Sequence, residues 1–273
     1  MKKLILITFT VICCICIIPY KAYAIDMSVG ATTWVAFGDR YDDVKENRER
    51  ESNSYAFAPT FLFGPVMSVK LSDEFNLTFV YLYGKFEYKE TFEGSIGLAN
   101  QDIKSKAERN DSDIAINYNI NNYFRAFAGI KYMSYKIDLS VDLAGDTYTN
   151  NSKHISLGPG FGFSGTLPVG YNFFLLGTVS GFYLFSKGET FKDYQIYTSS
   201  LLPMTIKVGY NEYGFNSTMA IAYYITPASM VISLGGRFQY FIVDYDNYRY
   251  FPINSITNKI YGVTLTATYN FSI

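Results

Sequence analysis

The sequence predicts an all-β protein, a closed antiparallel transmembrane β-barrel of 10 strands that follows a cleaved signal peptide. Three observations predict this fold class. The first residues have the form of a secretory leader. The last 13 residues alternate without a break between apolar residues and small or polar ones. Finally, the connections between such alternating segments are short and long in turn.

Residues 1–24 are predicted to be the signal peptide. Lys2 and Lys3 precede an apolar stretch, and two small residues, Ala22 and Ala24, stand at the −3 and −1 positions of a cut after Ala24. The apolar stretch is shorter than the ~20 residues that a membrane-spanning helix needs, which argues against an uncleaved anchor. Cleavage leaves one domain, residues 25–273, with no linker composition inside it.

The composition of the mature chain excludes several classes of function. All three cysteines (Cys13, Cys14 and Cys16) leave with the signal peptide, so no disulfide, thiolate metal site or cysteine nucleophile is expected. The 23 basic residues fall to 20 when Lys2, Lys3 and Lys21 leave, against 24 acidic ones, which argues against a nucleic-acid partner. No Gly-rich phosphate loop, HExxH, CxxC or EF-hand pattern occurs, so we expect no cofactor and no metal.

Aromatic residues make up 18% of the chain, with 26 Tyr and 23 Phe against one Trp. A soluble core does not need so many tyrosines. Aromatic rings at the two interfaces of a membrane barrel do, because the ring sits at the level of the lipid headgroups with its hydroxyl in water.

The strands are predicted from period-two alternation, the pattern of a strand with one apolar face. The last segment is the clearest, with apolar residues at every second position from Tyr261 to Ile273. Similar alternation through the mature chain gives 10 strands, while counts from 8 to 12 stay open. The predicted strands are 27–37, 54–71, 75–87, 112–120, 123–138, 154–166, 171–186, 213–225, 229–243 and 259–273.

The connections separate a membrane barrel from a soluble sandwich, which also alternates. Short turns are predicted at 72–74, 121–122, 167–170 and 226–229. Long polar segments are predicted at 38–53, 87–112, 139–153, 186–212 and 244–258. Alternating short and long connections are expected when one rim of a barrel faces the periplasm and the other faces outward.

Residues 203–211 complicate the strand count. They alternate with Met204 and Tyr210 on one face, but their parity differs from that of Met219 and Ile225 farther along. A bulge near Gly214 in one long strand would reconcile the two patterns, as would an extra hairpin in the outer loop or two further strands. We prefer a total of 10 strands.

At its C-terminus the chain resembles the small outer-membrane β-barrel superfamily of Gram-negative bacteria. The terminal strand ends Thr268-Tyr269-Asn270-Phe271-Ser272-Ile273, with Tyr269, Phe271 and Ile273 on one face, and looks like the signal read by the outer-membrane assembly machinery. The resemblance covers the whole mature chain. It implies an outer-membrane location, contact with membrane lipid and lipopolysaccharide, and a superfamily that includes pores, adhesion and structural proteins, and lipid enzymes.

His154 and Ser156 are the candidates for catalysis. The only histidine, His154, lies two residues before Ser156 on the polar face of a predicted strand. The pair resembles that of outer-membrane lipid A deacylases, in which a base polarises a serine hydroxyl. Two points argue for a hydrogen-bonded interior histidine instead: same-face neighbours on one strand are about 6–7 Å apart, and the next acidic residue is Glu189, in the following long connection.

Lys70, Arg125, Lys131 and Arg237 are basic residues on the polar faces of otherwise apolar strands. Facing lipid, each would cost about 2–4 kcal/mol near the midplane, so we predict that they face the lumen. There they either pair with inward carboxylates such as Asp113 or make a lumen that favours anions. Pairing is the preferred interpretation, because side chains fill a barrel of this size.

The sequence is compatible with three functions. The first is a non-enzymatic integral outer-membrane protein, either structural or a narrow passage for small solutes. The second is a surface interaction or adhesion protein that uses its long outer loops, although the mixed charges of residues 39–51 are typical of a solvated loop. The third is a lipid A-modifying acyl hydrolase at His154 and Ser156. The sequence does not indicate an oligomeric state.

Overall fold

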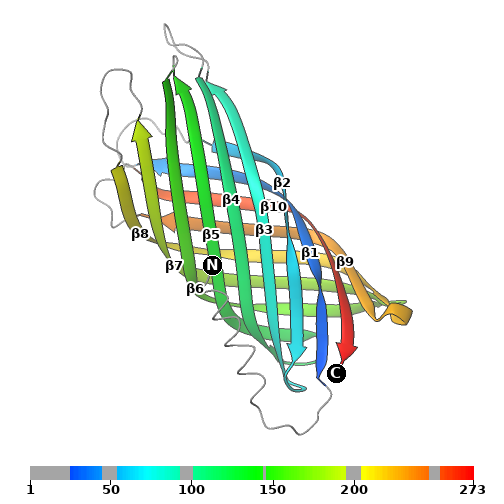
Figure 1. Ribbon diagram of the computed structural model, residues 1–273. Helices are drawn as coiled ribbons and strands as arrows, with labels where there is room; N and C mark the ends of the chain where they lie inside the picture. Colours follow the sequence, from blue (N-terminus) through cyan, green and yellow to red (C-terminus); the bar gives the residue numbers. More distant parts are fainter. Residues whose placement is uncertain (1–24, 45–53, 93–100, 144–145, 195–203, 246–252) are drawn as a thin grey trace.

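The computed structural model describes residues 25–44, 54–92, 101–143, 146–194, 204–245 and 253–273. These residues form 10 strands in one closed barrel (Figure 1). The strands are β1 (Asp26–Val44), β2 (Ser54–Lys70), β3 (Phe75–Phe92), β4 (Gln101–Asn119), β5 (Phe124–Leu143), β6 (Asp146–Gly170), β7 (Phe173–Tyr194), β8 (Met204–Ile225), β9 (Met230–Asp244) and β10 (Ile253–Ser272). The predicted signal peptide, residues 1–24, lies outside the described residues.

Each strand pairs antiparallel with its neighbours in the chain, and β1 pairs with β10 to close the barrel. At the closure, the Ile25 N–H donates to the Ile273 carbonyl at 2.9 Å and the Ile273 N–H donates back at 3.1 Å. Both ends of the barrel domain therefore lie side by side at one rim. The predicted closed antiparallel β-barrel and the count of 10 strands are confirmed.

The strands are longer than the sequence predicted. β3 continues to Phe92 and β4 begins at Gln101, although residues 87–112 were expected to form a long connection. The same correction applies at the outer ends of the other strands, where β1 reaches Val44 and β6 begins at Asp146. Where the side chains of these extensions are described, outward residues such as Lys106 and Lys153 are polar and exposed, so the extensions lack the apolar outer face by which a strand in lipid is recognised.

A bulge near Gly214, one of the three ways considered to reconcile the two parities, is not present in the register of β8 with its neighbours. β8 runs from Met204 to Ile225 in unbroken register with β7 and β9. Val208 and Tyr210 point into the barrel, with 6% and 8% exposure, whereas Met219 and Ile221 point outward, with 62% and 61%. The apolar side of the wall thus changes from outside to inside along one regular strand, because its lower part faces lipid and its upper part faces water.

One periplasmic turn also differs from the prediction. The sequence placed it at residues 167–170, but β6 continues through Gly170 with a register shift after Pro168. The turn is made by Tyr171 and Asn172, whose φ angles are 48° and 66°. Two consecutive residues with positive φ form the tight hairpin that matches the twist of antiparallel strands.

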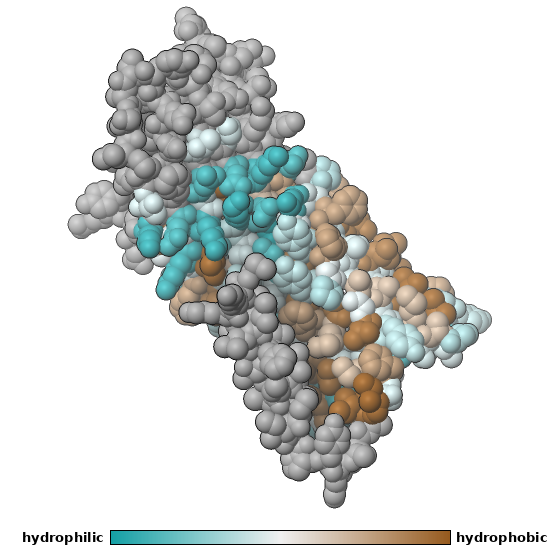
Figure 2. All heavy atoms as spheres, viewed as in Figure 1, coloured by the Kyte–Doolittle hydropathy of each residue, from teal (hydrophilic) through white to brown (hydrophobic). Residues whose placement is uncertain are grey.

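The outer surface carries an apolar band between two levels of aromatic residues. Phe75 and Tyr118 meet near the periplasmic rim, with ring centroids 5.3 Å apart, and Phe37 and Tyr261 stack at the outer level at 5.9 Å. Figure 2 shows hydrophobic residues gathered at the lower right of the visible face and hydrophilic residues above them. This is the surface of a barrel set in lipid. No helix in the described part of the chain is long and apolar enough to cross a membrane.

Candidate functional site in the barrel interior

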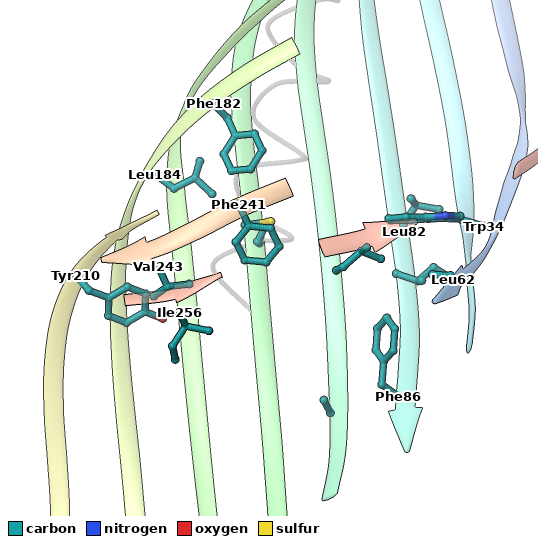
Figure 3. Packing of buried hydrophobic residues seen from close by; sticks show 14 of the residues in the cluster. Trp34, Leu62, Leu82, Phe86, Phe182, Leu184, Tyr210, Phe241, Val243 and Ile256 are labelled. Carbon is teal, nitrogen blue, oxygen red and sulfur yellow. The ribbon is translucent and has the colours of Figure 1, made fainter. Parts of the chain in front are cut away.

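The outer half of the barrel interior is filled with side chains. Trp34, Leu62, Leu82, Met133 and Leu184 have 0–2% exposure. Phe86, Phe182, Tyr210, Phe241, Val243 and Ile256 belong to the same buried cluster. Figure 3 shows two groups of these side chains inside the barrel, one around Trp34 and Leu82 and the other around Phe182 and Phe241. We call this layer the plug.

A polar network runs through the plug and bridges the lumen. Arg109 on β4 donates from Nε to Asp111 Oδ1 at 3.0 Å and from Nη2 to Asp111 Oδ2 at 2.6 Å. The same Nη2 donates to Gln239 Oε1 on β9 at 2.6 Å. Since β4 and β9 lie on opposite sides of the ring of strands, the bond from Arg109 to Gln239 crosses the barrel. Arg109, Asp111 and Gln239 are all buried.

The second polar group of the plug contains the serine that the sequence singled out. Ser156 Oγ donates to Glu212 Oε1 at 2.6 Å, and Ser186 Oγ donates to the same oxygen at 3.0 Å. Ser156 has 0% exposure and Glu212 has 1%. The carboxylate that sequence reasoning did not find beside Ser156 is therefore Glu212, two strands away, in a segment that had been assigned to a connection.

His154 lies inside the barrel, as its strand parity predicts, but its partner is a tyrosine. His154 Nδ1 is 2.7 Å from the Tyr210 hydroxyl. Gly188 on the neighbouring strand makes room for the ring, because a Cβ at this position would lie 2.8 Å from His154 Nδ1. His154 therefore does not contact Ser156 directly but is linked to it through Tyr210, whose hydroxyl also interacts with Ser156, and Ser156 donates to Glu212.

The structure places the four basic candidates in three settings. Lys131 is buried and contacts Asp113 at 3.0 Å and 3.2 Å, the partner suggested by the sequence. Lys70 and Arg125 lie at the periplasmic mouth, where Lys70 Nζ is 2.8 Å from Asp73 Oδ1. Both are therefore at the rim rather than deep in the lumen.

The fourth candidate, Arg237, has a different environment. Its guanidinium carbon lies 4.6 Å from the centroid of the Trp34 ring, a cation–π distance. Its Nε is buried without a hydrogen-bond partner, and so is the Trp34 Nε1. Arg237 is half-buried, whereas Gln239, the next inward residue on β9, is fully buried. Arg237 therefore stands at the inner face of the plug.

The periplasmic half of the interior is lined mostly by small residues that solvent reaches. Those of intermediate exposure include Ser28, Thr32, Gly64, Ser68, Thr78, Thr178, Ser180, Thr218, Ser233, Thr266 and Thr268. Small inward side chains leave space along the axis, as they do in barrels that enclose water. A cavity of about 500 Å³ opens at this mouth, lined in part by Ser28, Ser68 and Asn76. We call this space the vestibule. The cavity itself is lined by residues at the rim, such as Ser28 and Ser68, and between it and the plug the small inward residues keep intermediate exposure.

The predicted assembly signal lies on the outer face of β10. Tyr269 is 51% exposed and stacks on Phe271 at 5.9 Å, and Ile273 is 75% exposed. In the part of the chain that the structure describes, no group of three or more His, Cys, Asp or Glu residues could hold a metal ion.

Comparison with solved structures places this architecture among bacterial barrels. The outer-membrane protease OmpT of Escherichia coli superposes with a TM-score of 0.58 at 12% identity, over 93% of this chain and 99% of that one. The protein has the fold of an outer-membrane β-barrel. The translocator domain of the autotransporter NalP from Neisseria meningitidis gives 0.46 at 10% identity, over 93% and 90%. Ail of Yersinia pestis gives 0.30 at 9% identity, over 89% and 98%. No protein-family model and no curated protein matches the sequence.

Proposed function

We propose that this protein is a non-enzymatic structural barrel of the outer membrane whose lumen does not conduct solutes. The observation that carries the proposal is the bridged plug. The hydrogen bond from Arg109 to Gln239 joins opposite walls at 2.6 Å, and buried apolar side chains pack around it. The sequence left open a structural role and a narrow passage for small solutes. A passage would require this buried network to be broken, which would leave buried charged groups without hydrogen-bond partners.

Single-channel recording in planar bilayers tests the proposal. The wild-type barrel should insert without discrete conductance steps. A variant in which Arg109→Ser and Gln239→Ser shorten both sides of the bridge serves as the positive control and should give steps, because the lumen is widened where it is closed. Regular steps from the wild-type protein would overturn the proposal.

The surroundings of Ser156 also favour a role without catalysis. An acyl hydrolase must bring its serine to a lipid ester, but Ser156 is fully buried inside the barrel and donates to Glu212. His154, the potential base, bonds to Tyr210 instead. Expression of the wild type should leave the acyl composition of lipid A unchanged by mass spectrometry, identical to that of cells with Ser156→Ala. Loss of an acyl chain that depends on Ser156 would contradict this.

A second candidate is surface interaction, and the projecting wall favours it. Above the outer aromatic level the strands carry solvent-facing ion pairs, including Lys85 with Glu108 at 2.9 Å and Lys207 with Glu189 at 3.3 Å. A filled, water-compatible barrel end is a rigid base for the outer connections. Binding of expressing cells to host-cell or partner surfaces, with and without trimming of residues 93–100, tests this role. Equal binding by cells that express the wild-type and the trimmed protein, or no binding by either, would contradict a role in surface interaction.

A further inference from the structure

The interior cations of the barrel do not all have partners. Arg109 is held by Asp111, and Lys131 by Asp113, each through two hydrogen bonds. Arg237 Nε is buried without a hydrogen-bond partner, and the close contact of the guanidinium is the face of Trp34. Among the described residues, Asp111 and Asp113 attract Arg237 but lie beyond ion-pair distance. Burying guanidinium N–H groups without a hydrogen-bond acceptor destabilises the folded barrel, so an acceptor would be expected close to Arg237.

The position of Arg237 explains where an acceptor would come from. On the neighbouring strand β8 its register partner is Thr218, which solvent reaches. On the other side its register partner is Gly262, which carries no side chain. Toward the outside the plug begins at once with Gln239. The guanidinium is therefore accessible from the vestibule alone, that is, from the periplasmic side.

The groups around this position include three cations, Arg237, Arg109 and Lys131, against two carboxylates, Asp111 and Asp113, that attract Arg237. Both carboxylates already accept hydrogen bonds from Arg109 or Lys131, which leaves an excess of positive charge and of unused donors. Arg237 brings a planar fork of N–H groups, the Trp34 indole N–H is unpartnered, and Thr218 can donate from its hydroxyl. The Lys131 ammonium adds positive charge at this depth, although Asp113 partly offsets it. We propose that Arg237 and Trp34 form an anion-binding site at the floor of the vestibule, for a small molecule or chain end that carries a carboxylate or phosphate group and enters from the periplasm.

The proposal combines planar recognition with size selection. A guanidinium binds a carboxylate or phosphate through two parallel N–H bonds. On the periplasmic side of Arg237 the vestibule is lined by hydroxyl and glycine positions such as Thr32, Gly64 and Thr178, so a slender polar ligand fits better than a bulky apolar one. This site is independent of the proposed structural role, because it lies on the periplasmic side of the plug.

Trp34 makes the site directly measurable, since it is the only tryptophan of the chain. Its fluorescence, excited where tyrosine does not absorb, should change saturably when acetate or inorganic phosphate is added to the folded barrel in detergent. Acetamide, which has nearly the shape of acetate without its charge, should have no effect. A stronger response to acetate assigns a carboxylate ligand, and a stronger response to phosphate assigns a phosphate ligand.

Two variants locate the response. Arg237→Gln should weaken anion binding by about tenfold or more, the effect of losing a charged hydrogen bond. Arg125→Gln removes a positive charge at the exposed mouth and should leave the affinity unchanged. If Arg237→Gln does not fold, Arg237→Lys keeps the charge without the planar fork and should bind more weakly than the wild type. An unresponsive wild type, an equal response to acetamide, or equal losses in the Arg237 and Arg125 variants would overturn the proposal.

Discussion

The buried ion pair between Arg109 and Asp111 gives the sharpest test of the plug. Asp111→Asn keeps the shape of the side chain but removes the charge that faces two N–H donors at 3.0 Å and 2.6 Å. Both side chains are almost fully buried, with 0% and 2% exposure. Removing one partner of such a pair leaves an uncompensated charge and typically costs about 3–5 kcal/mol. The free energy of unfolding should fall by that amount.

The matched control is Asp138→Asn on the outer wall. Its partner Lys136 lies 3.1 Å away, but the two side chains are 40% and 57% exposed, so the loss should stay below about 1 kcal/mol. Reversible urea unfolding in lipid vesicles, followed by the fluorescence of Trp34, measures both. In addition, the double variant Arg109→Met with Asp111→Leu should lose less free energy of unfolding than Asp111→Asn alone, because it leaves no buried charge without a partner. Equal losses for Asp111→Asn and Asp138→Asn would refute the reasoning.

Three further predictions concern the lipid face, the histidine and the periplasmic turn. Ile116→Lys on the lipid-facing side of β4, where Ile116 is 52% exposed, should cost about 2–4 kcal/mol in vesicle unfolding; no loss would mean that this face is in water. Gly188→Val should displace the imidazole from its 2.7 Å contact with Tyr210 and destabilise the barrel by about 1–3 kcal/mol, whereas Gly177→Val, with open space around it, should not. The hydrogen bond from Lys70 lowers the pKa of Asp73 in the turn after β2. A depressed carboxylate pKa adds stability above the usual aspartate range and loses it as the pH falls through the folded value. Asp73→Asn should therefore remove a small acid-dependent part of the stability, and an unchanged pH profile would contradict this.

The sequence predicted the part of the fold that lies in lipid. There the environment is apolar outside, so residues such as Phe79 and Leu265 alternate with polar ones and mark their strands. Above the membrane the outer face of the strands is polar and the inner face is apolar. Val208 and Tyr210 are apolar because they face the plug, and Lys207 is polar because it faces water. A prediction that assumed one apolar face for the whole strand could place that segment only with a bulge, an extra hairpin or two further strands.

The candidate site was only partly predictable for the same reason. Parity along one strand put His154, Ser156 and Lys131 inside, and the structure places them there. The partners of His154 and Ser156 come from β8, in a segment read as a connection, so Tyr210 and Glu212 were missed. Pairing across a barrel depends on closure and stagger, which a single strand pattern does not contain. The inward position of Tyr210 could have been found from its alternation with Val208.

The central claim is a lumen that is open to the periplasm and filled toward the outside, and thiol reactivity along β7 tests it most directly. The three native cysteines all precede residue 25, so the barrel domain offers a background without thiols. Thr178 and Leu184 both face inward on β7, but Thr178 is reached by solvent and Leu184 has 0% exposure. In the folded barrel a cysteine from Thr178→Cys should react with a small water-soluble maleimide at close to the rate of a free thiol. A cysteine from Leu184→Cys should react only after unfolding. Equal rates at the two positions would contradict the account.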